Sequence, residues 1–180
     1  MRLSVIVLLP VLAVIPLATA AAAPLWHRWQ QACHEPTFAW PLGDPAHYAL
    51  RRDGYGDGMF GSHRRAGRSH NGIDLAAPIG TPVAAAKSGV VRDGRKHDGM
   101  GHYLEVHHVD GCTTLYGHLS RILVADGQFV RQGQPIGLVG KTGNARFRAI
   151  QPHLHFEIRL RGVPVDPLDG YLDGTGSRRS

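Results

Sequence analysis

The chain has 180 residues, of which 23 are Gly and 12 are Pro, and it carries 20 Lys or Arg against 14 Asp or Glu, a formal net charge of +6. Its abundant Gly and Pro and its few Glu and Lys exclude long amphipathic helices and coiled coils. Hydrophobic residues make up 43% of the chain, enough for a packed core, which excludes global disorder.

Residues 1–23 are typical of a secretory signal peptide. Arg2 is followed by an apolar run from Val5 to Leu17 and by small residues from Ala18 to Ala23. An uncleaved membrane anchor is the alternative, but two prolines interrupt the run and its length is marginal for spanning a bilayer. We therefore expect an exported protein without stable membrane insertion once the signal is removed.

Residues 24–54 form a predicted N-terminal extension, rich in aromatic side chains, that packs on the core. The chain has two cysteines, Cys33 in this extension and Cys112. In an oxidising compartment a Cys33–Cys112 disulfide is expected, and two separate thiols are the alternative. The Gly- and Arg-rich segment 51–69 is predicted to be a loop.

From His70 to Asp166 the chain alternates short β-prone runs with Gly or Pro turns. The close spacing of these runs predicts a mainly β, antiparallel fold over residues 55–172, either an open sheet or a barrel-sandwich-like domain. Residues 173–180 are predicted to be a C-terminal tail. The predicted strands are Pro82–Ala85, Gly89–Asp93, Tyr103–His108, Thr113–Tyr116, Pro135–Val139 and His153–Arg159.

Twelve His are present, and three local patterns of them suggest chemistry. In His70-Asn71-Gly72-Ile73-Asp74, a His and an Asp, both common zinc ligands, are four residues apart. Gly72 argues against a helix, but a turn leading into a strand would also bring the two side chains together. A surface His and a capping Asp would explain the motif equally well.

The second pattern is His153-Leu154-His155-Phe156-Glu157-Ile158, in which polar and apolar residues alternate. On a strand, His153, His155 and Glu157 share one face, so the two imidazoles can converge on one site. A half-exposed strand with polar decoration is the alternative. Glu157 is expected to face solvent, the alternative being a contact that orients a ligand His. The third pattern presents His118 at a turn after Tyr116-Gly117 and by itself indicates little.

These motifs, in this order, resemble peptidase family M23, the lysostaphin-type zinc metallopeptidases that cleave peptidoglycan. The similarity extends over about residues 55–172 and includes Gly80-Thr81-Pro82-Val83, the Gly-rich stretch 127–143 and Val165-Asp166-Pro167. The resemblance implies a mainly antiparallel β fold with a groove for a peptide.

The resemblance also implies roles for five side chains. His70, Asp74 and His155 would bind a zinc ion (Zn2+), and three protein ligands that leave a fourth position for water are typical of catalytic zinc. His118 and His153 would lie beside the zinc-bound water that attacks the scissile carbonyl, one as general base and the other helping to hold the oxyanion. The order of these two roles stays open.

The implied protein is an exported, zinc-dependent endopeptidase that hydrolyses peptide cross-links of bacterial peptidoglycan. The bond can be either one between D-Ala and a diamino acid or one in a Gly-rich bridge. We expect peptidoglycan stems as partners, a monomer, and no nucleic acid, because no basic stretch is interleaved with aromatic residues. The basic charge and the lack of a separate wall-binding module favour a periplasmic over a secreted protein.

Two other functions are compatible with parts of the sequence. One is a non-catalytic relative of the family that regulates another cell-wall hydrolase, although all five site positions are filled. The other is a lipoyl- or biotin-carrier domain, in which Lys87 would be the modified residue.

The chain departs from the usual family pattern between Gly143 and His153. The segment Asn144–Pro152 is longer than usual and carries Arg146 and Arg148. We expect it to border the groove, where either Arg can bind a carboxylate of the peptide. A solvated loop is the alternative.

Overall fold

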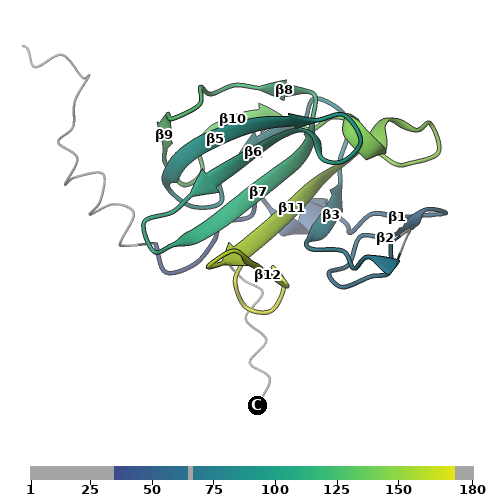
Figure 1. Cartoon of the computed structure of the whole chain (residues 1–180), viewed down its shortest axis with the longest axis horizontal. Coiled ribbons are helices and arrows are strands. Elements are labelled where there is room, and N and C mark those ends of the chain that lie inside the picture. Colours follow the sequence, from purple (N-terminus) through teal and green to yellow (C-terminus); the bar gives the residue numbers. More distant parts are fainter. Residues whose placement is uncertain (1–34, 65–66, 173–180) are drawn as a thin grey trace, which may run out of the picture.

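The structure is a computed structural model, and it describes residues 35–64 and 67–172 (Figure 1). The predicted signal peptide at residues 1–23, Cys33 and the predicted tail at residues 173–180 lie outside the described residues. The Cys33–Cys112 disulfide therefore stays a prediction. Among the described residues, no helix has the length and hydropathy that crossing a bilayer requires.

The main element of the fold is a seven-stranded antiparallel sheet. Neighbouring strands follow the order β12-β11-β7-β6-β5-β9, and β3 also pairs with β11, so the long strands cross the middle of the molecule side by side (Figure 1). The strands are β3 (Ile73–Ala76), β5 (Gly89–Lys96), β6 (Gly101–His107), β7 (Cys112–Leu119), β9 (Phe129–Val130), β11 (His153–Leu160) and β12 (Val163–Val165).

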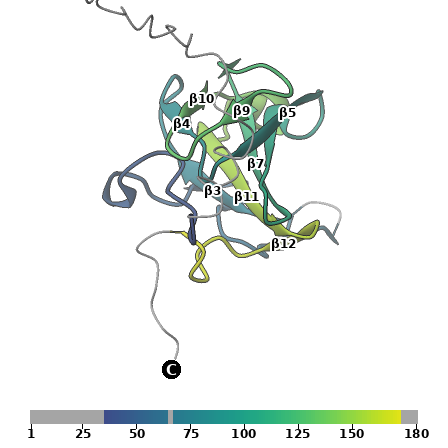
Figure 2. The same cartoon turned by 90° about the vertical axis from the view of Figure 1, so that its left-hand side faces the viewer.

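A smaller three-stranded sheet lies beside the main sheet (Figure 2). It is formed in the order β4-β10-β8 by β4 (Pro82–Ala84), β10 (Pro135–Leu138) and β8 (Arg121–Ile122). A separate hairpin joins β1 (Arg52–Asp53) to β2 (Gly56–Asp57). Two short 3-10 helices, η1 (Pro45–His47) and η3 (Gly143–Arg146), complete the described elements.

The hydrophobic core joins the two sheets. It includes Val83 and Ile136 from the smaller sheet and Leu104, Leu154 and Phe156 from the main sheet, all fully buried. The apolar side chains of β11 thus take one face of the strand, as the alternation predicts. The opposite face of the same strand carries His153, His155 and Glu157, and it is this face that forms the site.

The N-terminal part of the described chain is attached to this core. Phe38 is 4% exposed, and its backbone N–H donates to the carbonyl of Tyr171 at 3.0 Å. The carboxylate of Glu35 accepts hydrogen bonds from the backbone N–H and the hydroxyl of Ser88. Residues near the start and near the end of the described chain therefore pack against the same core.

The predicted fold class, mainly β with open antiparallel sheets, is confirmed. All six predicted strands are present, and β5 and β7 each extend three residues further along the chain than predicted. The segment 51–69, predicted to be a loop, contains the β1–β2 hairpin. The two-residue strands β8 and β9 are absent from the prediction because so short a segment shows no periodicity.

Candidate metal centre

Strand pairing brings two of the predicted metal ligands together. In the register of β3 and β11, Asp74 is the direct cross-strand partner of His155. His70 lies three residues before β3, where its backbone N–H donates to the carbonyl of Ser62 at 2.9 Å. Gly72 lets this segment approach β11, because a Cβ at that position would lie 2.2 Å from the carbonyl oxygen of Phe156.

The side chains of His70, Asp74 and His155 meet in one buried cluster. The Oδ1 atom of Asp74 lies 3.0 Å from Nε2 of His70 and 2.9 Å from Nδ1 of His155, and the two ring nitrogens are 3.0 Å apart. Ligands held by zinc at about 2.0–2.1 Å in tetrahedral geometry lie roughly 3.3 Å from one another. The three atoms are therefore spaced for a shared metal ion.

In each of the two imidazoles of the cluster, the ring nitrogen that faces away from Asp74 has its own partner. Nδ1 of His70 lies 2.8 Å from the carbonyl oxygen of Met59, and because a carbonyl only accepts, this nitrogen carries the hydrogen. Nε2 of His155 lies 2.8 Å from the carboxylate of Glu157. These contacts direct the lone pairs of Nε2 of His70 and Nδ1 of His155 at the centre of the cluster.

Glu157 corrects the expectation of a solvent-facing residue. It is 0% exposed, and its second oxygen accepts hydrogen bonds from the guanidinium of Arg159. A buried carboxylate is stabilised only when it is paired, and here His155 and Arg159 together satisfy it. Glu157 is therefore the residue that orients His155, the alternative that the sequence left open.

The second oxygen of Asp74 is held by two arginines. Its Oδ2 accepts from Nε and Nη2 of Arg51 at 3.2 and 3.1 Å and from Nη2 of Arg64 at 2.9 Å. Burial alone would raise the pKa of Asp74, but the imidazoles of His155 and His70 beside its Oδ1 outweigh burial, and the pKa lies well below its usual value. Asp74 therefore offers one oxygen, Oδ1, as an ionised ligand.

The charge around His155 suits a cation. Burial would lower the pKa of His155, but the carboxylates of Asp74 at Nδ1 and Glu157 at Nε2 raise it to about 9. Positive charge is therefore favoured where the three ligand atoms meet. Nitrogen and carboxylate donors in a three-residue set are also the ligands that zinc takes in catalytic sites.

His118 and His153 lie beside this cluster. Nε2 of His153 is 3.8 Å from Oδ1 of Asp74, and the rings of His118 and His153 have centroids 4.8 Å apart. Nδ1 of His118 is 2.9 Å from the carbonyl of Thr142, and Nδ1 of His153 is 2.6 Å from the carbonyl of Gln151. Each Nδ1 is thus fixed as a donor, which leaves each Nε2 as the acceptor nitrogen.

The backbone at His118 is strained. Its φ is 61°, in the left-handed region that non-glycine residues rarely adopt. Its backbone N–H donates to the carbonyl of Met100 at 2.7 Å, so a neighbouring strand end supports this conformation. Strain of this kind occurs at functional sites, where the surrounding structure holds a side chain in place.

Burial keeps both of these imidazoles neutral. Burial, followed by the nearby His153 and His155, lowers the pKa of His118 to about 3. Burial also lowers the pKa of His153, against the opposing effect of Asp74. At neutral pH both Nε2 atoms are therefore unprotonated and able to take a proton.

The site opens into a cavity of about 630 Å³. All five predicted site residues line it, and so do residues 96 and 98–100 and parts of the long segment after Gly143. The expectation that this segment borders the groove is confirmed, because Asn144 and Phe147 line the cavity. The cavity connects the cluster of His70, Asp74 and His155 to solvent.

Arg146 and Arg148 do not line the cavity. The guanidinium of Arg146 donates to the carbonyls of His97 and Gly143 and to the carboxylate of Asp98, at 3.0–3.1 Å. Arg146 thus ties η3 to the β5–β6 hairpin. These contacts, and the absence of Arg146 from the cavity lining, give no support to the expectation that Arg146 binds a substrate carboxylate.

Sequence reasoning missed the arginines that hold Asp74. Arg51 is 4% exposed and also pairs with Asp53, and Arg64 is partly buried. Both belong to the Gly- and Arg-rich segment interpreted as a loop, in a chain where Arg supplies 17 of 20 cations. No local pattern distinguishes these two from the other arginines.

Comparisons with known proteins place this geometry in context. A family model described as Peptidase family M23 matches residues 68–167. The chain is 48% identical over 99 residues to peptidoglycan DD-endopeptidase ShyA of Vibrio cholerae serotype O1. The matched residues make up 55% of this chain and 22% of that protein. It is 46% identical over 101 residues to DD-carboxypeptidase/endopeptidase Mpg of Neisseria meningitidis serogroup B, and this match covers 56% of this chain and 22% of that protein.

A solved structure is also similar. A zinc-containing peptidase from Vibrio cholerae matches with a TM-score of 0.61 at 42% identity, over 77% of this chain and 41% of that chain. The match covers about a fifth of the length of the two curated relatives.

Proposed function

Because the chain belongs to peptidase family M23, we propose that it is an exported, zinc-dependent endopeptidase that hydrolyses peptide cross-links of bacterial peptidoglycan. The observation that carries the proposal is the meeting of His70, Asp74 and His155 in one buried cluster beside His118 and His153. The names of the similar DD-endopeptidases support the choice of substrate. We propose the periplasm as its location.

We propose that zinc is held by Nε2 of His70, Oδ1 of Asp74 and Nδ1 of His155. These are the atoms that face one another, while the remaining polar atoms of the three side chains are bound to Met59, the two arginines and Glu157. Zinc bound there supplies Lewis-acid activation of water and of the scissile carbonyl. The protein keeps the ligand set in place through those outer contacts.

His118 and His153 are proposed to move the protons. Their Nδ1 atoms are fixed on backbone carbonyls, so each Nε2 can accept a proton from the attacking water. A protonated Nε2 can then donate to the developing oxyanion or to the leaving amine. With two such imidazoles in edge contact, one can accept a proton while the other assists.

The two alternative functions lose support. A non-catalytic regulator is not favoured, because all five positions are occupied and converge on one cavity. A carrier domain would need Lys87 at an exposed turn. Lys87 is instead 5% exposed, and its ammonium is paired with Asp110.

The test is digestion of purified peptidoglycan by the mature, zinc-loaded protein, with released fragments identified by mass. We expect cross-linked dimers to be converted to monomers, with loss of this activity on chelation and recovery when zinc is restored. Asp74→Asn, which keeps the size of the side chain, serves as the inactive control. Intact cross-links after treatment with the zinc-loaded protein would overturn the proposal.

A further inference from the structure

Some of the charged side chains that line the cavity have an ion-pair partner, and others do not. Each of its three carboxylates has a cationic partner: Asp74 is paired with two arginines, Asp98 with Arg146, and Glu157 with Arg159. These pairs also use the lining cations Arg51 and Arg64. The other two lining cations are Arg68 and Lys96, and within residues 35–64 and 67–172 neither has a carboxylate at ion-pair distance.

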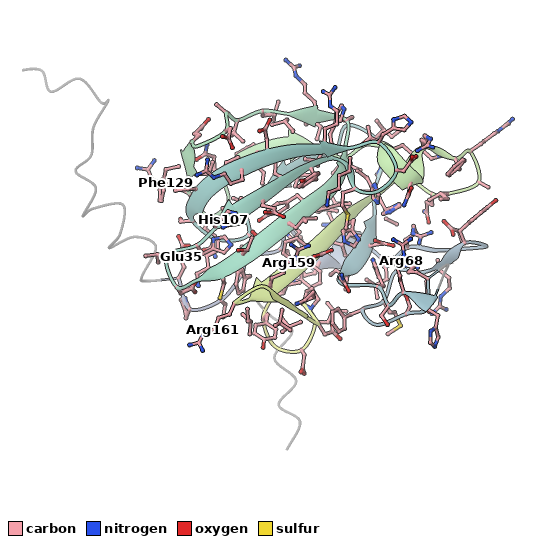
Figure 3. All side chains as sticks on the ribbon, in the orientation of Figure 1. Glu35, Arg68, His107, Phe129, Arg159 and Arg161 are labelled. Carbon is pink, nitrogen blue, oxygen red and sulfur yellow. The ribbon has the colours of Figure 1, made fainter. Side chains whose placement is uncertain are left out.

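Arg68 is fixed by its backbone, and among the described residues no hydrogen bond or ion pair engages its side chain. Its carbonyl accepts the backbone N–H of Arg64 at 2.7 Å, and the next residue, Ser69, bridges to His63. Figure 3 shows Arg68 well apart from Arg159. Arg159 lies on β11 and forms an ion pair with Glu157. The Arg68 guanidinium therefore offers its donors to a ligand in the cavity.

Lys96 is held by an aromatic ring. Its Nζ lies 5.6 Å from the ring centroid of Tyr103, and that ring lies over Gly94, the cross-strand partner of Tyr103. A Cβ on Gly94 would come within 2.2 Å of the ring, so only Gly admits this packing. Contact with an aromatic face orients an ammonium group but leaves its positive charge available.

The two cations lie on opposite sides of the catalytic residues. Arg68 precedes β3, and Lys96 ends β5, while β11 and β7, which carry His153, His155 and His118, lie between β3 and the β5–β6 pair. Three to four strand spacings correspond to roughly 14–19 Å. An extended peptide covers that distance in about four to six residues.

We propose that Arg68 and Lys96 bind free carboxylates of the peptide on the two sides of the scissile bond. Guanidinium and ammonium groups are the natural partners of carboxylates. The inference rests on the proposed function and specifies its substrate: stems whose carboxylates are ionised, in preference to amidated stems or to Gly-rich bridges that carry no side-chain charge.

Two matched ligands test this inference. One is a fluorescently labelled, cross-linked stem dimer with free carboxylates, in which a non-hydrolysable isostere replaces the cross-link amide, and the other is the same dimer with those carboxylates amidated. Binding is measured by fluorescence anisotropy with zinc-loaded wild type, Arg68→Gln, Lys96→Gln and the double variant. Arg95→Gln, an equal charge change at the exposed neighbour of Lys96 that does not line the cavity, is the control.

We expect each single variant to bind the free-carboxylate peptide about fivefold more weakly and the double variant about 25-fold more weakly, as for two separate exposed ion pairs. The amidated peptide should bind all proteins alike, at the level of the double variant. The wild-type preference should shrink as salt is raised. Arg95→Gln should behave as wild type.

Equal affinity of the wild type for both peptides would overturn the inference, as would equal losses for both peptides in the variants. Cross-link cleavage, measured in parallel, distinguishes this failure from failure of the proposed function. If the wild type cleaves peptidoglycan but does not discriminate between the peptides, only the role of Arg68 and Lys96 is wrong.

Discussion

The carboxylate of Asp53 accepts a hydrogen bond from the backbone N–H of Gln151 at 3.0 Å, although the two residues are 98 positions apart in the chain. Asp53 also accepts from Arg51, which in turn holds Asp74, a proposed metal ligand. The carbonyl of Gln151 lies 2.6 Å from Nδ1 of His153. A continuous hydrogen-bonded chain thus connects a proposed metal ligand to a proposed proton-transfer residue.

Asp53→Ala should impair turnover more than metal binding. The substitution leaves a buried guanidinium donor of Arg51 unpaired, so we expect the free energy of unfolding to fall by about 1–3 kcal/mol. The segment that fixes His153 loses its anchor, so kcat should fall while KM and zinc stoichiometry stay near wild type. Urea unfolding, metal analysis and steady-state kinetics check this. Asp126→Ala, at an exposed carboxylate that accepts from Arg92 and from the backbone N–H of Asp93, is the control, and an unchanged kcat in Asp53→Ala would contradict the positioning role.

Removing a proposed ligand should empty the metal centre. His70→Ala and Asp74→Ala each take away one of three donors, and we expect zinc content to fall from about one equivalent to near zero, with loss of activity. Elemental analysis after dialysis, with circular dichroism as a check of folding, measures this. His107→Ala, at a half-exposed imidazole outside the cavity, should keep full zinc. Retention of one tight zinc by both ligand variants would refute the assignment.

His118 should be separable from metal binding. We expect His118→Ala to keep zinc and to lose turnover by on the order of 10² or more, the effect of removing a general base. Because the backbone φ at this position is 61°, His118→Asn should fold better than His118→Ala, since Asn tolerates the left-handed region. Kinetics and metal analysis of both variants decide the matter; near wild-type turnover in either would exclude His118 as the base.

His108 makes stability depend on pH. Its ring is buried between the carbonyl of Ser88 and the hydroxyl of Thr114, and burial lowers its pKa to about 4. Between pH 6.5 and about 4 the unfolded chain takes up a proton that the folded chain does not, so stability is lost as pH falls through this window, by about 3 kcal/mol. Urea unfolding at pH 7.5 and 4.5, with chelator present, should show a smaller pH dependence in His108→Gln than in wild type. Identical dependence in the two proteins would show that His108 does not contribute.

The site-bearing strands could be predicted because their signals are local. The alternation from His153 to Ile158 assigns a strand and its two faces, and β11 has both. The burial of Glu157 could not be predicted, since a polar residue on such a face is ordinarily solvated. It is buried because Arg159 and His155 pair with it, and the sequence does not reveal that the face itself is covered.

The hydrogen bonds that hold Asp74 could not be predicted for a different reason, which is that they join residues far apart in the chain. Arg51 reaches Asp74 across 23 residues, and Asp53 reaches Gln151 across 98. Contacts at such separations depend on the completed topology, and a two-residue strand such as β1 leaves no periodic signal. The motifs therefore identify the residues proposed to do chemistry, while the residues that hold them become visible only in three dimensions.

Asp74 and His155 face each other across β3 and β11 although 81 positions separate them in the chain. A partly folded chain therefore has the proposed ligands but does not bring them together, so metal binding would report that this one strand pairing has formed. A cation that binds the native chain alone also shifts the folding equilibrium toward it by mass action. Under the proposed function, hydrolytic competence and resistance to unfolding would thus be acquired in the same event.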